Sequence, residues 1–246
     1  YGLFRDGRTA GILPLESPQI RQRLRQGQPT DLHSLIRLLR GEGRGAIDFA
    51  SILLCHVCAS LKAQRPAAFY AAALSQAGQD VRRAAVLVDE ASTQGLRINE
   101  VDINYSTWRW AVEKDALRPG FLVVHGVTAA AGAEIMAKRR EMHFASIEDL
   151  CARTDRSRLR ASALVALAKA GAFDSLGDSR ADVLEQIARM HPSSPAIRKL
   201  VPGLSGADEI PGFFDQDSSW FAEQTEDTAT AGNGGDETAK RRAQEQ

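Results

Sequence analysis

His125, Gly126, Val127 and Thr128 form a short segment whose residue types suit a tight turn between two helices. An apolar run, residues 121–124, precedes it, and a helix rich in alanine is expected to follow. The first turn of a helix leaves backbone N–H groups without partners, and these groups bind phosphate oxygens. The segment therefore predicts a site that holds a nucleic-acid backbone and does not read the bases.

The pattern is that of a helix-hairpin-helix module, with Thr128 in place of the usual second glycine of the hairpin. The Thr128 hydroxyl can accept a hydrogen bond from a first-turn amide, so we expect it to cap the following helix. His125 either touches a phosphate or only caps the turn. The residues predicted to bind DNA are His125, Gly126, Val127, Thr128, Lys138 and Arg139.

Four passages resemble, in the same order, the bacterial DNA polymerase III alpha subunit family, of replicative or error-prone type. Residues 9–40, TAGILPLESPQIRQRLRQGQPTDLHSLIRLLR, resemble the fingers sequence of that family. LKAQRPAAFYAAALSQ and VDEASTQGLRINEVDINYSTW follow within residues 61–108, and AKAGAFDSLG ends at Gly177. The resemblance covers most of residues 9–187.

The resemblance implies template-directed DNA synthesis by the complete polymerase, with Mg²⁺ as its metal. It implies DNA as a partner, together with the sliding clamp and other replisome subunits. It also implies that Ser17, Arg21 and Arg40 contact the nucleotide or the template. The alternative for the arginines near residue 21 is a solvated helix face.

Polymerase chemistry needs clustered carboxylates that hold two Mg²⁺ ions, and the palm that carries them in the family has no counterpart here. The segment most similar to such a carboxylate cluster, Asp102-Ile103-Asn104, has one carboxylate. We expect Asp102 to be a turn or strand-end residue. We therefore predict no catalytic residue, metal ligand or cofactor in this chain. No polymerisation is expected from the isolated chain.

Tyr1 falls in the middle of a family pattern, and the middle of the fingers, expected after Arg40, is missing. We expect either a part of a longer polymerase or a decayed copy, and the junction at residues 40–46 is a natural deletion or a gene-model error. The alternative function is a stand-alone, non-catalytic adaptor that binds DNA or a clamp.

The 31 basic and 31 acidic residues leave no net charge, which argues against strong independent DNA binding. Three cysteines do not make a disulfide framework, and no segment resembles a signal peptide or a membrane span, so we expect a cytoplasmic protein without a membrane partner. Cys55 and Cys58 have metal-like spacing, but no second pair exists. We expect them to be small core residues.

The expected fold is mainly α, with a helical fingers remnant, a small β-element, the helix-hairpin-helix module and a disordered C-terminal tail. The predicted regions are 1–45 (partial fingers), 46–115 (helices and β-element), 116–190 (DNA-binding module) and 191–246 (linker and tail). Helices are expected near 18–26, 30–40, 48–64, 67–76, 80–93 and 129–190.

Alternating apolar residues predict the β-element over residues 96–125, including the run 121–124. Trp108 and Trp110 either anchor this element or stack on bases, and the first interpretation is favoured. In the tail, Gln216, Trp220 and Phe221 resemble a clamp-binding peptide in which Ser219 replaces the usual leucine.

Overall fold

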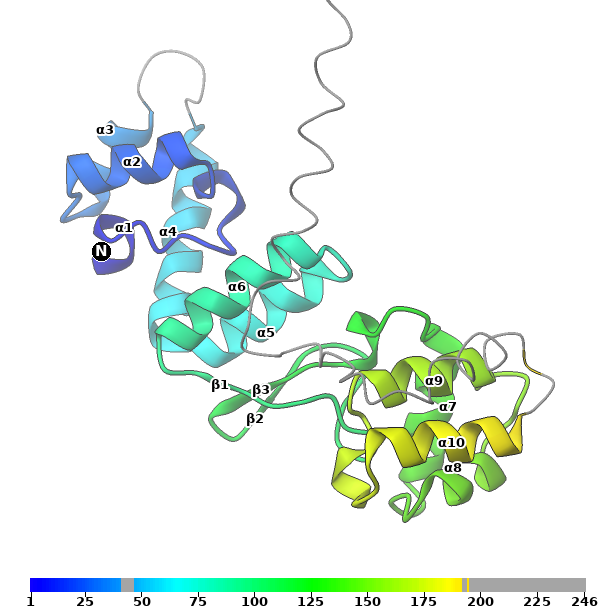
Figure 1. Cartoon of the computed structure of the whole chain (residues 1–246). Helices are drawn as coiled ribbons and strands as arrows, with labels where there is room; N and C mark the ends of the chain where they lie inside the picture. The colour runs from blue at the N-terminus through cyan, green and yellow to red at the C-terminus, as the bar shows by residue number, and fades with distance from the viewer. Residues whose placement is uncertain (41–46, 192–193, 195–246) are drawn as a thin grey trace, which may run out of the picture. The chain divides into compact units, whose positions relative to one another are not determined.

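The computed structural model describes residues 1–40, 47–191 and 194 (Figure 1), all within one compact unit of the chain. Helices dominate, as predicted. The helices are α1 Gly2–Arg5, α2 Pro18–Gly27, α3 Leu32–Leu39, α4 Phe49–Gln64, α5 Pro66–Ala77, α6 Val81–Thr93, α7 Ala129–Arg139, α8 Ile147–Arg153, α9 Ala161–Lys169 and α10 Arg180–Met190. The 3₁₀ turns η1 Leu13–Leu15, η2 Phe121–Val123 and η3 Asp174–Leu176 and the strands β1 Arg97–Ile98, β2 Ala111–Glu113 and β3 Ala116–Arg118 complete the described elements.

Several helices begin where a short polar side chain precedes the first turn. Ser17, Asp31, Asp48 and Asp80 each accept a hydrogen bond from a backbone amide three residues later and so cap α2, α3, α4 and α6. After α6 the chain turns at Gly95, whose φ of +82° lies in the left-handed region that glycine adopts easily. The helices predicted before residue 95 are confirmed.

A hydrophobic core joins α1, η1, α2, α3 and α4. Cys55 is 2% exposed within it and Cys58 packs against it, which confirms the prediction that these cysteines are core residues. The buried members of the core are Phe4, Ile12, Leu15, Ile20, Leu24, Leu35, Leu39, Ile52, Cys55 and Ala59.

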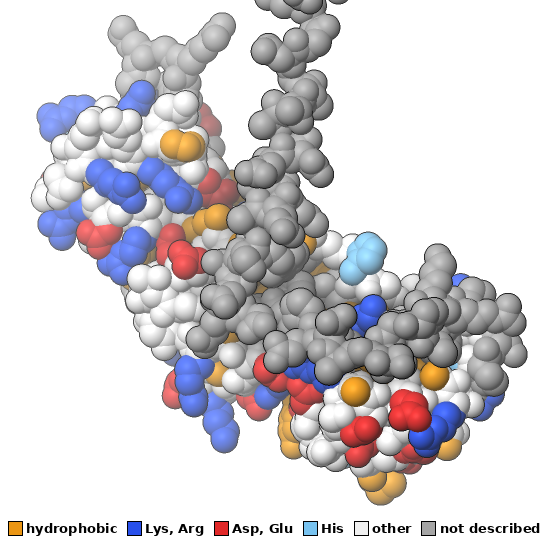
Figure 2. Space-filling view, in the orientation of Figure 1, with side chains coloured by type: hydrophobic (Ala, Val, Ile, Leu, Met, Phe, Trp, Pro, Cys, Tyr) orange, Lys and Arg blue, Asp and Glu red, His pale blue; other side chains and the backbone are white. Residues whose placement is uncertain are grey.

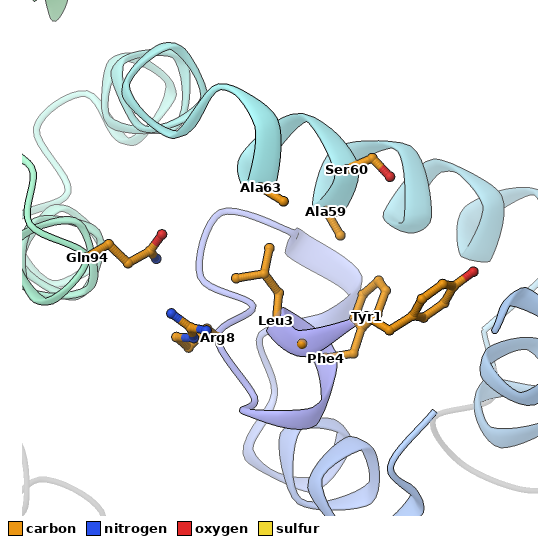
Figure 3. A pocket seen from close by; sticks show the side chains of 9 residues that line it. Tyr1, Leu3, Phe4, Arg8, Ala59, Ser60, Ala63 and Gln94 are labelled. Atoms are coloured by element: carbon orange, nitrogen blue, oxygen red, sulfur yellow. The ribbon is translucent and has the colours of Figure 1, made fainter. Parts of the chain in front are cut away.

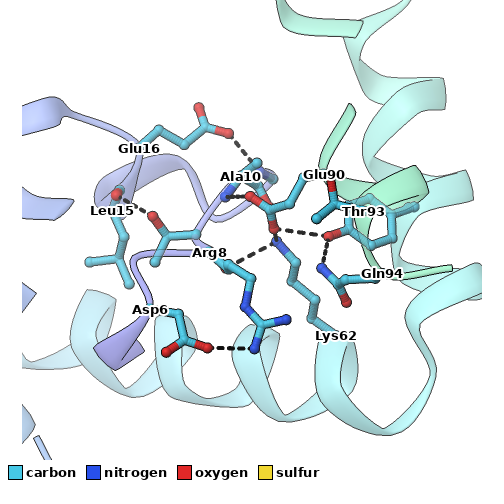
Figure 4. Close-up of polar contacts among 12 residues, drawn as sticks. Asp6, Arg8, Ala10, Leu15, Glu16, Lys62, Glu90, Thr93 and Gln94 are labelled. Carbon is cyan, nitrogen blue, oxygen red and sulfur yellow. Dashed lines mark hydrogen bonds and ion pairs between the residues drawn. The ribbon is translucent and has the colours of Figure 1, made fainter. Parts of the chain in front are cut away.

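A buried polar network connects the N-terminal loop to α4, α5 and α6 (Figure 4). The Lys62 ammonium, fully buried, donates to the carbonyl oxygens of Ala10 at 2.6 Å and Arg8 at 3.2 Å and pairs with Glu90. The Tyr70 hydroxyl donates to the same Glu90 carboxylate at 2.9 Å. Burial lowers the pKa of Lys62, while Glu90 opposes this shift.

This network brings together three of the passages that carry the polymerase resemblance. In the first passage, Thr9 donates to the Leu15 carbonyl at 2.7 Å and Glu16 accepts from the Gly11 amide at 2.7 Å. Lys62 comes from the second passage and Glu90 from the third. These motif residues therefore hold the fold together.

The small β-element is present and has the order β1-β3-β2. Strands β1 and β3 are parallel, with Arg97 opposite Ala116, and β2 and β3 are antiparallel, with Val112 opposite Leu117. Strand β3 lies beyond the region boundary predicted after residue 115, and the region boundaries themselves stay predictions.

The prediction that the apolar run 121–124 belongs to the β-element was wrong. Residues 121–123 form the 3₁₀ turn η2, because the amides of Val123 and Val124 bond to the carbonyls of Gly120 and Phe121, at 3.3 and 3.1 Å. The amides of Phe121 and Leu122 bond to the carbonyls of Thr107 and Trp108, at 2.9 Å each, and anchor the turn. The neighbouring residues Val123 and Val124 are both buried, whereas successive side chains of a half-buried strand point to opposite faces, so the run does not alternate as a strand does.

The two tryptophans contribute to packing. Trp110 is 6% exposed, and the Trp108 ring lies so close to α7 that a Cβ at Gly132 would be 2.7 Å from it. The favoured interpretation as packing residues is confirmed, although Trp108 packs on α7 and not only within the β-element. No described helix is both long and apolar enough to cross a membrane.

Candidate nucleic-acid interface

The hairpin between η2 and α7 presents its polar backbone to solvent and its apolar side chains to the core. His125, Gly126 and Thr128 are exposed, whereas Val124 and Val127 are 6% and 5% exposed. The Val127 amide bonds to the Val124 carbonyl at 3.1 Å and closes the turn. The buried valines therefore fix the position of the exposed backbone between them.

Thr128 caps α7 as predicted, since its Oγ1 accepts a hydrogen bond from the Ala131 amide at 3.2 Å. Gly126 has a φ of +95°, a backbone conformation that is costly for any side chain. A threonine can therefore replace the second glycine of the hairpin, while Gly126 is required by the turn itself.

A group of backbone amides at this end of α7 has no hydrogen-bond partner among the described residues. They belong to exposed positions, and no acidic side chain lies in the first turn of α7. The positive end of the helix dipole reinforces their attraction for an anion. The amides are those of His125, Gly126, Thr128, Ala129 and Ala130.

The two basic residues predicted for this site, Lys138 and Arg139, lie in the last turn of α7. With a rise of about 1.5 Å per residue, Lys138 is about 15 Å along the helix from Thr128. Lys138 is partly exposed and forms a 3.8 Å ion pair with Glu141. The structure thus separates these residues from the hairpin amides by most of the helix.

Arg139 is directed into the protein. Its Nη1 donates to the Ile103 carbonyl at 3.1 Å, and its guanidinium lies 5.9 Å from the centre of the Phe121 ring. Burial lowers the pKa of Arg139, although the Asp102 charge opposes that effect. This side chain supports η2, on which the hairpin rests, and is poorly placed to meet a phosphate.

A lysine that sequence reasoning missed lies near the hairpin. The Cβ position at Gly126 is 3.6 Å from the Ala166 side chain, so α9 passes beside the turn. Lys169 is exposed and follows Ala166 by three residues, which places both on one face of α9. The spacing in sequence gave no signal for this neighbour, because the contact joins residues 40 positions apart.

Asp102 is a turn residue, as expected. It is 8% exposed, and its Oδ1 accepts from the amides of Asn104 at 2.7 Å and Tyr105 at 3.1 Å. Among the described residues, no three His, Cys, Asp or Glu side chains lie close enough together to hold a metal ion. The described part of the chain therefore offers no group of three such ligands for the Mg²⁺ that the resemblance implies for the complete polymerase.

The residues predicted to contact the nucleotide or the template lie on two helices that pack against each other, α2 and α3. Ser17 caps α2 and Arg21 lies in its first turn, whereas Arg40 is the C-cap of α3, where its amide bonds to the Ile36 carbonyl at 2.9 Å. Figure 2 shows basic side chains over the surface where α1 and α2 lie. Arg5 of α1 and Arg25 of α2 are both exposed. The Arg21 Nε is buried with no hydrogen-bond partner among the described residues.

A pocket of about 360 Å³ lies between the N-terminal residues and α4 (Figure 3). Arg8 is the one charged side chain among its lining residues, and the rest are mainly small or apolar. It offers no pair of groups suited to acid–base or nucleophilic chemistry. The lining residues are Tyr1, Gly2, Leu3, Phe4, Arg8, Ala59, Ser60, Ala63 and Gln94.

The predicted clamp-binding residues Gln216, Trp220 and Phe221 lie outside the described residues, as does the predicted disordered tail. Both stay predictions. The hairpin at the start of α7 is therefore the candidate site that the structure supports most directly.

A comparison with known proteins matches the region that contains the hairpin. Residues 95–183 match the helix-hairpin-helix motif. The chain is 29% identical over 158 residues to the DNA polymerase III subunit alpha of Halalkalibacterium halodurans, over 64% of this chain and 14% of that protein. It is 34% identical over 134 residues to the same subunit of Escherichia coli K12, over 52% of this chain and 11% of that protein.

The error-prone DNA polymerase of Anaeromyxobacter sp. (strain K) is 30% identical over 185 residues, a match that covers 66% of this chain and 16% of that protein. The chain thus spans 11–16% of the length of these relatives. The resemblance predicted from the four passages is confirmed, including the helix-hairpin-helix part.

Proposed function

Since this chain is related to part of the DNA polymerase III alpha subunits and error-prone DNA polymerases, we propose that it binds DNA as a segment of such a polymerase. The hairpin at residues 124–128 holds the sugar-phosphate backbone and does not select a sequence. The process served is DNA replication or repair synthesis.

The exposed amides at the start of α7 are the observation that carries this proposal. They present N–H donors at a helix N-terminus, with buried valines behind them and no carboxylate in the first turn. Lys169 adds a positive charge beside the turn. Backbone amides and a single lysine recognise phosphate oxygens, which are the same for every base sequence.

The test is fluorescence anisotropy of the purified chain with two labelled duplexes of equal length and different sequence. We expect equal affinity for both duplexes and weaker binding as salt rises. His125→Glu places a carboxylate beside the amides and should weaken binding about tenfold, the loss of one charge-assisted phosphate contact. A duplex preference, or unchanged binding by this variant, would contradict the proposal.

Lys114→Glu is the matched control, because Lys114 is exposed in the turn between β2 and β3 and not in the hairpin. It removes a positive charge and adds a negative one, so it changes the net charge strongly. If general electrostatics governed binding, this control would weaken it at least as much as His125→Glu does.

Catalysis by this chain alone is not part of the proposal, since among the described residues no three His, Cys, Asp or Glu side chains come together in a group that could hold a metal ion. We expect no primer extension when the chain is mixed with primed template, deoxynucleotides and Mg²⁺. The control is a sample from cells that lack the chain, taken through the same purification. Incorporation of nucleotides by the purified chain and not by this control would show that a catalytic site has been missed.

We also propose that the sliding clamp and other replisome subunits bind the polymerase to which this chain belongs. The tail peptide predicts that clamp capture by the full chain is lost with Trp220→Ala and Phe221→Ala. Capture that survives both substitutions would remove the peptide from the proposal and leave a non-catalytic DNA-binding adaptor as the alternative function.

A further inference from the structure

Helix α4 exposes an apolar face that no described element covers. Its opposite face packs into the core through Ile52, Cys55 and Ala59. On the exposed face, Leu54 is 65%, Val57 is 53% and Leu61 is 52% accessible to solvent. Isolated apolar residues are common on protein surfaces, but three large ones aligned on one helix face are not.

The exposed residues follow the spacing of a coiled-coil seam. Ala50, Leu54, Val57, Leu61 and Gln64 are all exposed, and they occupy successive a and d positions of two heptads. Such spacing fits a second helix packed alongside, in contrast to a strand or a flat surface. We call these five residues the α4 seam.

The positions that flank the seam carry no charge. They are Ser51, Leu53, Cys58 and Ser60, where coiled coils usually place the acidic and basic residues that select one partner over another. Lys62 is the one Lys, Arg, Asp or Glu residue of α4, and it is buried in the network with Glu90. Two identical seams therefore meet without repulsion between like charges.

The sizes of the seam residues are also self-complementary in one orientation. When two copies of α4 run antiparallel, Leu54 of one copy lies against Val57 of the other, and Leu61 lies against Ala50. Each leucine then faces a smaller side chain, and a two-fold axis relates the paired contacts. A parallel pair would instead place leucine against leucine and alanine against alanine.

We propose that the α4 seam is a self-association surface, through which two copies of this chain pair with their α4 helices antiparallel. The seam spans two heptads, which is short, so the dimer is weak and its population depends on protein concentration. This surface is separate from the hairpin, so the proposal does not depend on DNA binding.

The experiment measures the mass of the full chain by sedimentation equilibrium from about 1 to 100 µM, the range in which weak pairs form. We expect a concentration-dependent dimer. Leu54→Glu and Val57→Lys, each alone, should weaken it about tenfold or more, since each puts an unpaired charge in the seam. Val86→Glu is the control, because Val86 is also an exposed aliphatic residue, 48% accessible, on α6.

Combining Leu54→Glu with Val57→Lys tests the orientation. In the antiparallel pair each introduced carboxylate lies beside an introduced ammonium of the other copy, so the double variant should regain the dimer. In a parallel pair like charges would meet, and the dimer would stay lost. Circular dichroism confirms that each variant is folded, which is expected because both positions are exposed.

A chain that is monomeric across the concentration range overturns the proposal. So does a dimer that Leu54→Glu leaves unchanged, or one that Val86→Glu weakens equally. Loss of the dimer in both single variants without recovery in the double variant overturns the antiparallel pairing.

Discussion

The buried charge of Lys62 contributes to the stability of the fold. Its ammonium is fully buried among the Arg8 and Ala10 carbonyls and the Glu90 carboxylate. Lys62→Met would leave that carboxylate and both carbonyls without their partner, so we expect a loss of about 3 kcal/mol in the free energy of unfolding. Urea denaturation measures it, with the exposed Lys114→Met as the control. A change under about 0.5 kcal/mol, the range of surface substitutions, would show that the network contributes little.

The three cysteines differ in their surroundings, and their reactivity should differ as well. Burial raises the pKa of Cys55 and of Cys151 to about 11. Because the thiolate is the reactive form, only about one in a thousand of these thiols is ionised at pH 8.

We therefore expect iodoacetamide to modify Cys58 first in the dilute native protein at pH 8, and peptide mapping by mass spectrometry identifies the site. Raising the pH toward 11 should increase the reactivity of Cys55 and Cys151 as their thiols ionise. In urea all three should react at similar rates. Faster modification of Cys55 than of Cys58 in the native state would mean that α4 opens readily.

At the scale of the element, the hairpin depends on one left-handed residue. Gly126→Ala has room for its methyl group, 3.6 Å from Ala166, so its cost comes from the φ of +95° and is about 1–2 kcal/mol. We expect this strain to move the hairpin amides and weaken DNA binding in the anisotropy assay.

Gly95→Ala is a matched control, since Gly95 has a φ of +82° with nothing within 4 Å. It should cost about the same stability and leave DNA binding unchanged. Equal weakening of DNA binding by both variants would mean that general destabilisation, and not the hairpin, explains the effect.

Local signals predicted most of the helices, because caps such as Ser17 and Asp48 act within one turn of chain. The run 121–124 was predicted wrongly, since its apolar residues are typical of a strand, whereas its backbone forms the local bonds of η2 and is anchored by long-range bonds to Thr107 and Trp108. Thr128 could be identified as a cap from sequence because its partner, Ala131, is three residues away.

At the scale of the whole molecule, the sequence predicted the hairpin as a candidate site but did not predict which basic residues lie beside it. Lys138 and Arg139 were predicted from their charge and their nearness in sequence, yet both lie at the far end of α7 from the hairpin. The Arg139 side chain contacts the Ile103 carbonyl and the Phe121 ring instead. Lys169 was missed because only the packing of α9, whose Ala166 lies beside Gly126, brings that helix to the hairpin. The basic residues nearest to the hairpin in sequence are therefore not the basic residues nearest to it in the fold.

The neutral net charge of the chain makes a further prediction about DNA binding. With 31 basic and 31 acidic residues there is no general positive field, and the proposed contacts are mostly uncharged amides with Lys169 and at most Lys138. Neutralising about two phosphates gives a slope near −2 for the logarithm of the binding constant against the logarithm of salt concentration. Anisotropy titrations across a series of salt concentrations measure the slope, and Lys169→Gln should reduce its magnitude by about one. A slope several times steeper, unchanged by Lys169→Gln, would locate the main DNA contacts on another surface, with the arginines of α1 and α2 as the first to be substituted.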